Sequence, residues 1–358
     1  MLFGPQSLSW PRAILHLDMD AFYVNVHVLY QPEDGGIPLV VGGRPEERGV
    51  VASASYEARR FGIRSAMPCS QAVRLCPQVK IVPANWPRIR ECSDQVMAVL
   101  EAYGPVEKMS VDEAYVDLSD WSDPVPLADE IRTSVKNNTG LPASVGLASS
   151  KLVAKVASDH DKPEGCTVVL PGDEAAFLAP LPVRVIWGIG PKTTERLARM
   201  QIETCGQLAA ADLTRLQQGF GNQAEGMKRR AQGIDERMVQ AERDRPKSIS
   251  QEWTFSRDVN DREQLLAQLR QMSDGVAQSL QKRRLVAGTV RVKFRWDDFT
   301  TFTRQKSIEF GVDNAEVIYR LAETIWEENW PPGQKVRLLG VGVSSLEESA
   351  ARQLGFGF

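Results

Sequence analysis

Three acidic side chains at predicted strand ends are the residues best suited to do chemistry in this sequence. Asp18 ends a short apolar segment, and Asp112 and Glu113 lie between two strand-like segments, 106–109 and 114–118. If these strands are neighbours in one sheet, the three carboxylates converge and bind divalent cations. Two Mg²⁺ ions about 3.5 to 4 Å apart would activate an attacking oxygen and stabilise a leaving phosphate in an in-line displacement. The simpler interpretation of any one of these acids is that it is a solvated side chain at a strand end. Only the three acids together therefore indicate a metal site.

Cationic side chains that suit a phosphate-bearing substrate lie elsewhere in the chain. Tyr56, Arg59 and Arg60 share a short predicted helix, and Lys162 follows another. An anionic triphosphate needs cations besides a metal, so these residues are candidate phosphate ligands. Surface arginine and lysine alone do not indicate such a site.

Two other stretches have both a structural and a functional interpretation. Phe22 and Tyr23 follow the Asp18 segment, where aromatic residues at the start of a helix are usually core residues. The run Gly188-Ile189-Gly190-Pro191-Lys192 is either a simple turn and cap or a helix N-terminus that offers free N–H groups to a backbone phosphate.

The elements that must position these residues fall into successive regions. Residues up to Pro87 form a mixed subdomain, and from there to Pro171 strands alternate with helices, which favours a sheet covered by helices on one face. Residues 171–242 have an entirely helical pattern. The charged, proline-containing segment 241–247 has the composition of a tether between domains.

The last region has the order βαββαβ. Its predicted elements are strand 248–255, helix 261–282, strand 287–296, strand 301–310, helix 314–328 and strand 336–344. Asp313, three residues before Glu316, predicts a capping box on the second helix.

A basic sheet face is predicted within this region. The cations Arg291, Lys293 and Arg295 alternate along one strand with the apolar residues Val292, Phe294 and Trp296. The two-residue period of a strand places the cations on the free face of the sheet and the apolar side chains against the helices.

Composition limits the class of protein. The chain has 358 residues, 42% hydrophobic and 25% charged, as in an ordinary globular protein of roughly two to three domains. It has no apolar run of about 18 residues and no signal-peptide pattern, so we expect a cytoplasmic protein without membrane contact. Five cysteines without a C-x-x-C pair and only three histidines disfavour a disulfide framework, a zinc knuckle or a histidine triad. The net charge of −3 gives no support to a nucleic-acid partner, which would need local basic surfaces.

Several motifs together carry a family resemblance. They are residues 15–23 (Leu-His-Leu-Asp-Met-Asp-Ala-Phe-Tyr), 52–62, 110–115 (Ser-Val-Asp-Glu-Ala-Tyr), 149–157, 162–165 (Lys-Pro-Glu-Gly) and 187–190 (Trp-Gly-Ile-Gly). These motifs occur in the order typical of one family and extend over nearly the whole chain. On them the sequence resembles a Y-family, or lesion-bypass, DNA polymerase, closest to the bacterial DinB or polymerase IV branch.

The resemblance implies an α+β fold, a right-hand polymerase with palm, small fingers, a helical thumb with a helix-hairpin-helix, and a C-terminal βαββαβ little finger. The implied boundaries are palm 11–21 and 88–171, fingers 22–87, thumb 172–242, linker 243–248, little finger 249–346 and tail 347–358.

The resemblance also implies roles for individual residues. Asp18, Asp112 and Glu113 would be catalytic metal ligands, with the Met19 carbonyl completing one site. Nucleotide contacts would come from Phe22, Tyr23, Ser53, Tyr56, Arg59 and Lys162, with Tyr23 as the steric gate against the sugar and Ser53 where the family usually has threonine. DNA contacts would come from Gly188, Gly190, Lys192, Arg291, Lys293 and Arg295.

The implied activity is template-directed, low-fidelity DNA synthesis past lesions by two-metal nucleotidyl transfer, without a proofreading exonuclease. Its cofactor would be two Mg²⁺ ions, with Mn²⁺ as a substitute, and its partners primer-template DNA and dNTP, acting as a monomer. A catalytically inactive DNA- and clamp-binding scaffold of the same fold is the alternative. A nucleotide cyclase with a similar palm is a further rival, but a cyclase has no reason to carry the thumb and the basic sheet.

The tail resembles the Gln-Leu-x-x-Phe type of peptide by which bacterial polymerases dock on the sliding clamp. Its residues for this contact are Gln353, Leu354, Phe356 and Phe358. Exposed apolar groups at a terminus favour docking, and the alternative is that they fold back on the little finger.

Three departures from the family pattern affect detail. Ser55 stands where asparagine is expected, Val26-His27 where an acidic residue is usual, and Glu164 where the Lys-Pro-Asn-Gly turn has asparagine. None of these departures touches a predicted metal ligand, so they bear on nucleotide affinity and lesion preference.

Overall fold

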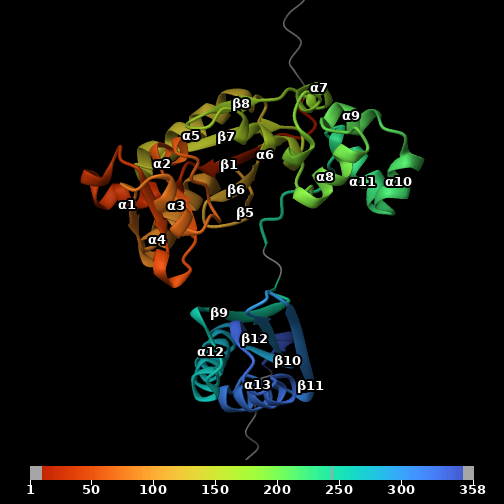
Figure 1. Ribbon diagram of the computed structural model, residues 1–358. Helices are drawn as coiled ribbons and strands as arrows, with labels where there is room; N and C mark the ends of the chain where they lie inside the picture. Colours follow the sequence, from red (N-terminus) through yellow and green to blue (C-terminus); the bar gives the residue numbers. More distant parts are fainter. Residues whose placement is uncertain (1–9, 243–244, 350–358) are drawn as a thin grey trace, which may run out of the picture. The chain divides into compact units, whose positions relative to one another are not determined.

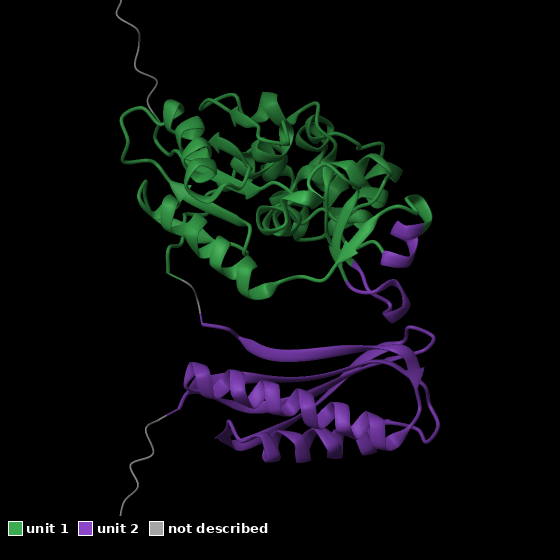
Figure 2. Cartoon of the chain, turned by 90° about the vertical axis from the view of Figure 1, so that its left-hand side faces the viewer, with its two compact units in different colours: residues 1–42, 51–67, 74–243 green, residues 43–50, 68–73, 244–358 purple. Residues whose placement is uncertain are grey.

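The structure, a computed structural model, describes residues 10–242 and 245–349. The chain divides into two compact units (Figure 2). Unit 1 comprises residues 1–42, 51–67 and 74–243, and unit 2 comprises residues 43–50, 68–73 and 244–358. Each unit has its own hydrophobic core. Within the part of the chain that the structure describes, no helix combines the length and apolarity needed to cross a membrane.

The central sheet of unit 1 has five strands in the order β5-β6-β1-β7-β8 (Figure 1). The strands are β1 (Ile14–Met19), β5 (Val106–Lys108), β6 (Glu113–Asp117), β7 (Ala143–Ala148) and β8 (Cys166–Val168). All neighbouring pairs are antiparallel except β7 and β8. The first strand of the chain therefore lies at the centre of the sheet, next to the strand that carries the second acidic cluster.

Helices cover both faces of this sheet, so the expectation of one covered face is wrong. On one face α4 (Trp86–Glu101) and α5 (Val125–Thr139) pack against Leu15 and Leu17. On the other, α6 (Lys151–His160) packs against β1 and β7. Gly146 permits this close approach, because a Cβ there would lie 2.2 Å from the Ala154 carbonyl oxygen. Every residue of β7 is buried, as in a strand covered on both sides.

A three-stranded sheet forms the second part of unit 1, in the order β3-β2-β4. Its strands are β2 (Leu39–Gly42), β3 (Val51–Ala54) and β4 (Lys80–Val82), and the neighbouring helices are α1 (Phe22–Tyr30) and α2 (Tyr56–Arg60). The 3-10 turn η1 (Pro32–Asp34) lies between α1 and β2. Most of helix α3 (Cys69–Leu75) and all of the 3-10 turn η2 (Pro45–Glu47) belong to the residues of unit 2.

Ser55 has a structural role in this region. Its hydroxyl oxygen accepts from the Ala58 N–H at 3.1 Å as the N-cap of α2 and from the Leu39 N–H at 3.0 Å. The hydroxyl also donates to the Ile37 carbonyl at 3.0 Å. The departure from asparagine therefore still gives α2 a side-chain cap.

The segment after Pro171 is only partly helical. It contains α7 (Glu174–Leu178), the 3-10 turn η3 (Val183–Val185), α8 (Pro191–Arg199), α9 (Cys205–Ala210), α10 (Leu213–Phe220) and α11 (Gln223–Ala231). Residues 232–242 contain no helix, so the prediction of helix up to residue 242 is wrong. Instead Asp235 and Arg237 bind each other, and the Leu152 N–H donates to Asp235 at 3.0 Å, which fixes this segment on α6.

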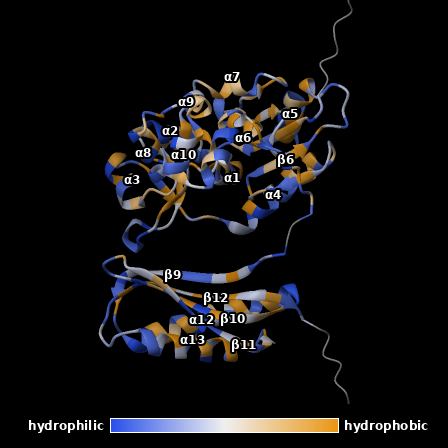
Figure 3. Ribbon diagram, turned by 90° about the vertical axis from the view of Figure 1, so that its right-hand side faces the viewer, coloured by the Kyte–Doolittle hydropathy of each residue, from blue (hydrophilic) through white to orange (hydrophobic). Residues whose placement is uncertain are grey.

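Unit 2 contains the predicted βαββαβ fold. Its elements are β9 (Ser248–Val259), α12 (Arg262–Arg283), β10 (Leu285–Trp296), β11 (Thr301–Val312), α13 (Ala315–Asn329) and β12 (Val336–Glu348). The strands form an antiparallel sheet in the order β11-β10-β12-β9, with both helices on one face (Figure 2). Both helices carry hydrophilic and hydrophobic residues in alternation (Figure 3), as helices that cover one face of a sheet do.

Three details differ from the expectations. The N-cap of α13 is Asn314, not Asp313, and its side-chain oxygen accepts from the Glu316 N–H at 2.9 Å. Helix α4 begins at Trp86, so the predicted boundary at residue 88 falls within its first turn. Strand β12 runs to Glu348, four residues beyond the predicted strand end at residue 344, because its pairing with β10 continues to the Leu285–Glu348 pair.

Candidate active site

The structure brings the predicted carboxylates to one edge of the central sheet of unit 1. In the antiparallel pairing of β1 with β6, Asp18 is directly opposite Glu113. The Met19 N–H donates to the Asp112 carbonyl at 2.9 Å, which fixes the hairpin that carries Asp112 against the end of β1. Side chains opposite each other in an antiparallel pair lie on the same face, so Asp18 and Glu113 are neighbours.

Ser110 shapes this hairpin. Its hydroxyl oxygen accepts from the N–H groups of Asp112 at 3.1 Å and Glu113 at 3.0 Å. The same hydroxyl donates to the Asp112 carboxylate. A single serine thus holds both acidic residues in place, a role that the sequence pattern alone did not reveal.

Asp18 lies in a low-dielectric position next to a cation. Burial raises the pKa of its carboxyl to about 6, although the Lys162 ammonium opposes this rise. The Lys162 Nζ lies 2.5 Å from Asp18 Oδ1 and 3.0 Å from Asp159 Oδ1. The predicted phosphate ligand Lys162 is therefore an ion-pair partner of a predicted metal ligand.

Glu113 is stabilised as a carboxylate by two groups. The His16 imidazole and the Lys155 ammonium lower the pKa of Glu113 to about 2, against the opposing effect of burial. Lys155 Nζ lies 2.7 Å from Glu113 Oε2, and His16 Nε2 lies 3.8 Å from the same oxygen. The His16 ring is fully buried, its Nδ1 lies 2.7 Å from the Ser158 hydroxyl, and burial lowers its pKa. Sequence reasoning missed His16 and Lys155, because a sequence does not show that α6 crosses this face of the sheet.

The predicted nucleotide residues gather at one cavity beside Asp18. Nine of the ten residues predicted as catalytic, metal or nucleotide ligands line this cavity of about 140 Å³: Asp18, Met19, Phe22, Tyr23, Ser53, Tyr56, Arg59, Asp112 and Lys162. The tenth, Glu113, lines an adjacent cavity of about 320 Å³. Phe22 is also a core residue with 2% of its surface exposed, in agreement with the structural interpretation of that position.

The orientation of two residues in this cavity follows from their contacts. The Tyr56 hydroxyl donates to Asp20 Oδ1 at 3.1 Å, and burial and the Asp20 charge raise the pKa of Tyr56 to about 12. The Arg59 Nε donates to the Ala54 carbonyl at 3.1 Å, and its guanidinium lies 4.6 Å from the Tyr56 ring centroid. Burial and the nearby Asp112 charge raise the pKa of Tyr23.

Asp20 is a structural carboxylate that organises the other side of the cavity. It is 1% exposed and accepts hydrogen bonds from the Ser144 hydroxyl at 3.0 Å, from the Glu164 N–H at 2.8 Å and from Tyr56. Asp20 therefore connects β7 and the Lys162 turn to α2. The sequence alone does not reveal this role of Asp20, because its partners Ser144 and Glu164 are distant in the chain.

The other two departures from the family pattern also have partners. His27 Nε2 lies 2.7 Å from Asp34 Oδ2, and Lys80 binds the same carboxylate. The Glu164 side chain binds Lys136, while its backbone N–H binds Asp20.

The donor chemistry of the site suits a divalent cation. Within residues 10–242 and 245–349, no three His, Cys, Asp or Glu side chains lie in an arrangement that could hold a metal ion. Asp18 and Glu113 instead hold the Lys162 and Lys155 ammonium groups. Oxygen donors from two adjacent strands, which already attract cations, are nevertheless the ligands that Mg²⁺ prefers.

The predicted DNA-binding residues of unit 1 surround the start of α8. Gly188 has a φ of +92°, a left-handed conformation that glycine adopts without strain, and Gly190 is the N-cap without a side-chain acceptor. Lys192 lies exposed in the first turn of α8. Trp187 is 60% exposed beside this turn, and its carbonyl accepts from Arg230 at 2.9 Å.

The predicted basic face of unit 2 is present but partly neutralised. Val292 and Phe294 are buried against the helices, whereas Arg291, Lys293 and Arg295 lie on the opposite face. Lys293 pairs with both carboxylate oxygens of Glu252 on β9 at 2.8 Å. The Arg295 Nε donates to the Thr301 hydroxyl at 2.8 Å. Glu252 therefore reduces the positive charge that the strand alone suggested.

The predicted clamp residues Gln353, Leu354, Phe356 and Phe358 lie outside the described residues.

Comparisons with known proteins agree with this architecture. Residues 17–159 match the model of the impB/mucB/samB family, residues 246–356 match that of its C-terminal domain, and residues 171–202 match the IMS family HHH motif. A curated relative from Alkalilimnicola ehrlichii, named DNA polymerase IV, is 42% identical over 96% of this chain and 98% of its own length. A relative of the same name from Methanoculleus marisnigri is 41% identical over 96% of both chains.

A solved structure has the same fold. A Y-family DNA polymerase chimera of Dbh and Dpo4 superposes with a TM-score of 0.83 at 24% identity, covering 94% of this chain and 99% of its own. This similarity confirms the predicted α+β polymerase fold. Because the family models and the relatives cover nearly the whole sequence, the chain belongs to the impB/mucB/samB family, the Y family of DNA polymerases.

Proposed function

We propose that this DNA-directed DNA polymerase copies damaged templates with low fidelity, by two-metal nucleotidyl transfer and without proofreading. The observation that carries the proposal is the position of Asp18, Asp112 and Glu113 at one sheet edge, next to the cations Arg59 and Lys162. Family membership, with relatives named DNA polymerase IV, supports DNA and nucleotides as the substrates.

The carboxylates would hold the cofactor. Asp18, Asp112, Glu113 and the Met19 carbonyl would bind two Mg²⁺ ions, for which Mn²⁺ is the expected substitute. When bound, these ions supply Lewis-acid stabilisation of the attacking primer oxygen and the leaving pyrophosphate. Ser110 contributes by holding Asp112 and Glu113 in a fixed hairpin.

The cations around the cavity would bind the triphosphate. Arg59 and Lys162 supply positive charge, and Tyr56 and Ser53 supply hydroxyl groups. Tyr56 is already oriented by Asp20, and Lys162 is available once its partner Asp18 binds another cation. Preorganised charges of this kind stabilise the charge that develops during phosphoryl transfer.

Tyr23 would exclude ribonucleotides. Its ring lines the same cavity as the carboxylates and Arg59, and Phe22 packs beside it at a ring-centroid distance of 5.9 Å. A ring placed under the sugar collides with a 2′-hydroxyl. Replacing Tyr23 by alanine should raise the use of rNTP relative to dNTP.

The DNA-binding surfaces would lie on both units. Gly188, Gly190 and Lys192 would contact the backbone of the duplex through the amide groups at the start of α8, and Arg291, Lys293 and Arg295 would contact phosphates from the sheet of unit 2. We further propose that Gln353, Leu354, Phe356 and Phe358 bind the bacterial sliding clamp, and that the enzyme acts as a monomer in the cytoplasm.

Family models match residues 17–159, 171–202 and 246–356 to polymerase regions, and none of these matches is to a nuclease. The proposed lack of proofreading refers to these polymerase regions alone. The alternative of an inactive scaffold of the same fold is not favoured, because the relatives at 41% and 42% identity are named DNA polymerase IV. The intact set of three carboxylates argues against it, since a scaffold has no need to keep them.

The test is running-start primer extension across damaged and undamaged templates, with a second primer that ends in a 3′ mismatch. We expect synthesis past at least one lesion and no shortening of the mismatched primer when dNTPs are left out. Extension that always stops before lesions would contradict the translesion proposal, and removal of the mismatched nucleotide would contradict the absence of proofreading.

A further inference from the structure

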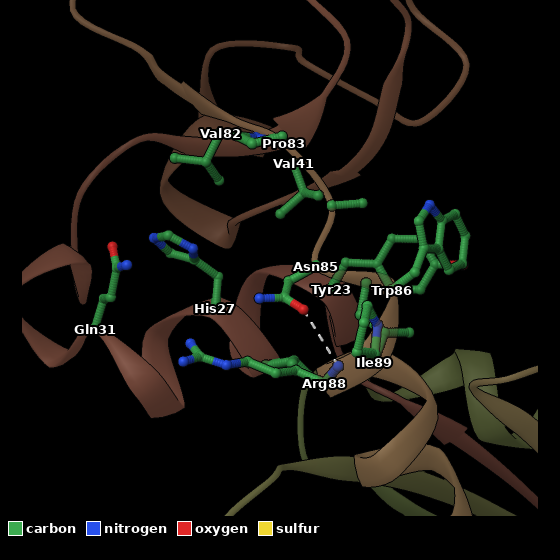
Figure 4. Close-up of a pocket in the computed structure, with 13 residues that line it drawn as sticks. Tyr23, His27, Gln31, Val41, Val82, Pro83, Asn85, Trp86, Arg88 and Ile89 are labelled. Atoms are coloured by element: carbon green, nitrogen blue, oxygen red, sulfur yellow. Dashed lines mark hydrogen bonds between the residues drawn. The ribbon is translucent and has the colours of Figure 1, made fainter.

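Tyr23 lines two cavities of unit 1. One is the cavity of about 140 Å³ that Asp18, Asp112 and Arg59 also line. The other is a larger cavity of about 540 Å³ (Figure 4). We call this second space the rear cavity. It is bounded by α1, the end of β4 and the start of α4, with Val41, Val82 and Ile89 among its apolar walls.

The rear cavity gives the Tyr23 side chain space to move. A side chain that has packed atoms on all sides occupies one rotamer, whereas one next to a void has a second rotamer within reach. Among the described residues, no hydrogen bond fixes the Tyr23 hydroxyl. The ring position therefore depends on the groups packed against its faces and edges.

Two aromatic rings make these contacts. Phe22, its neighbour on α1, lies 5.9 Å away between centroids with the planes at 55°. Trp86 lies 5.6 Å away with the planes at 68°, an edge-to-face contact. Figure 4 shows Tyr23 and Trp86 side by side at one end of the rear cavity, with His27 and Arg88 toward the other end.

The position of Trp86 is fixed by the start of its helix. It is the first residue of α4, directly after the N-cap Asn85, whose side chain accepts from the Arg88 N–H at 3.3 Å, and Pro87 occupies the first turn. Yet Trp86 is 47% exposed, so core packing explains only part of its presence. Its ring also contacts Tyr23.

We propose that Trp86 is a positioning residue for sugar discrimination, which holds the Tyr23 ring against the nucleotide cavity and prevents it from turning into the rear cavity. This inference rests on the proposed role of Tyr23 as the steric gate. Trp86 touches neither the nucleotide cavity nor the carboxylates, so it acts only through Tyr23. Its loss should therefore affect the choice of sugar and leave dNTP insertion unchanged.

The size of the effect follows from the contact. An edge-to-face aromatic pair changes a two-state rotamer equilibrium by roughly two- to tenfold. Trp86→Ala should thus raise kcat/KM for rNTP relative to dNTP by about that factor, mainly through a lower KM for rNTP. Tyr23→Ala, which removes the ring entirely, should have the larger effect.

The experiment measures single-nucleotide insertion of rNTP and dNTP by the full chain and four variants. Trp86→Ala removes the contact, Trp86→Phe keeps a ring, and Tyr23→Ala tests the gate itself. Trp121→Ala is the matched control, because Trp121 is similarly exposed at 44% and lines neither cavity. Thermal unfolding of each variant verifies that the fold is intact.

The expected result is weaker discrimination in Trp86→Ala, near-normal discrimination in Trp86→Phe and no change in Trp121→Ala. Unchanged discrimination in Trp86→Ala, alongside a loss in Tyr23→Ala, would overturn the role of Trp86 and leave the gate intact. Equal losses in Trp86→Ala and Trp86→Phe would also overturn it, since a ring at that position would then make no difference. No change in Tyr23→Ala would instead remove the gate, and the role of Trp86 with it.

Discussion

Glu107 and Lys151 form a buried ion pair that fixes the acidic hairpin to α6. Removing either partner or both should lower the free energy of unfolding by different amounts. Lys151 Nζ lies 2.5 Å from Glu107 Oε2, and the two side chains are 5% and 16% exposed. Glu107 lies on β5 opposite Tyr115 of β6, the strand that begins with Glu113. The pair thus holds the two strands on either side of the acidic turn against the helix.

The two partners retain different contacts when the other is removed. In Lys151→Met, the Glu107 carboxylate keeps the Gln240 N–H at 2.7 Å. In Glu107→Gln, the buried Lys151 ammonium gains only a neutral amide in place of the carboxylate. It retains its contacts with the Met238 carbonyl at 3.5 Å and the Tyr115 ring at 4.8 Å. Breaking a buried pair by removing one partner costs about 3 to 5 kcal/mol. We therefore expect a loss of about 3 kcal/mol for Glu107→Gln and about 2 kcal/mol for the more exposed carboxylate left by Lys151→Met.

The double variant gives the decisive comparison. With both charges gone, no buried charge remains unpaired, so the loss of unfolding free energy should be about 2 kcal/mol rather than the sum of the single losses. Hydrogen exchange over a urea series, read by mass spectrometry on peptides of β5 and α6, measures this free energy within unit 1. Losses that simply add in the double variant would show that the two charges do not interact, against the expectation of a coupled pair.

Three further predictions concern other parts of the chain. Asp235→Asn should lower the stability of unit 1 at neutral pH by about 1 to 3 kcal/mol. Burial favours the protonated form of Asp235, but its bonds to Arg237 and Leu152 hold its pKa in the folded protein below the ordinary 3.8. The Asp235 carboxylate therefore stabilises the fold fully above pH 3.8, and this stabilisation is lost as the pH falls below that value. Unfolding midpoints should therefore differ at neutral pH and converge in acid, and a constant difference would count against the carboxylate. Arg291→Glu or Arg295→Glu should flatten the salt dependence of DNA binding, lowering the slope of log affinity against log salt by about 0.9 for each phosphate that the arginine neutralises, measured by fluorescence anisotropy. Lys293→Glu should matter less because Glu252 already neutralises this lysine, and equal effects at all three positions would contradict this pairing. Deletion of residues 353–358 should leave distributive synthesis normal and abolish stimulation by the sliding clamp, whereas equal stimulation of both forms would exclude tail binding.

The main elements of the fold could be predicted from the sequence because their signals are local. The alternation of apolar and basic residues from Arg291 to Trp296 predicted both the strand and its two faces. The apolar segment before Asp18 and the segments around Asp112 predicted strands, and the β1–β6 register shows that these strands are neighbours, with Asp18 opposite Glu113.

Contacts between distant parts of the chain could not be predicted. The second covered face of the central sheet depends on Gly146 meeting the α6 backbone, which no local pattern encodes. Lys155 and His16 come to Glu113 only through that packing. The sequence also could not identify the N-cap of α13, because Asp313 and Asn314 are adjacent and both residue types are good N-caps. Only the backbone geometry selects Asn314.

The proposed function requires that the acidic edge of β1 and β6 performs metal-dependent nucleotidyl transfer. Its most direct test is primer extension with Mg²⁺ by Asp112→Asn and Glu113→Gln variants, with binding to primer-template DNA measured in parallel. Asparagine and glutamine keep the shape of the side chains while removing the charge that would hold the ions. We expect extension to be lost in both variants while DNA affinity stays within about twofold, because the proposed phosphate contacts lie elsewhere on the chain. Extension near the original rate in either variant would contradict the assignment of these carboxylates.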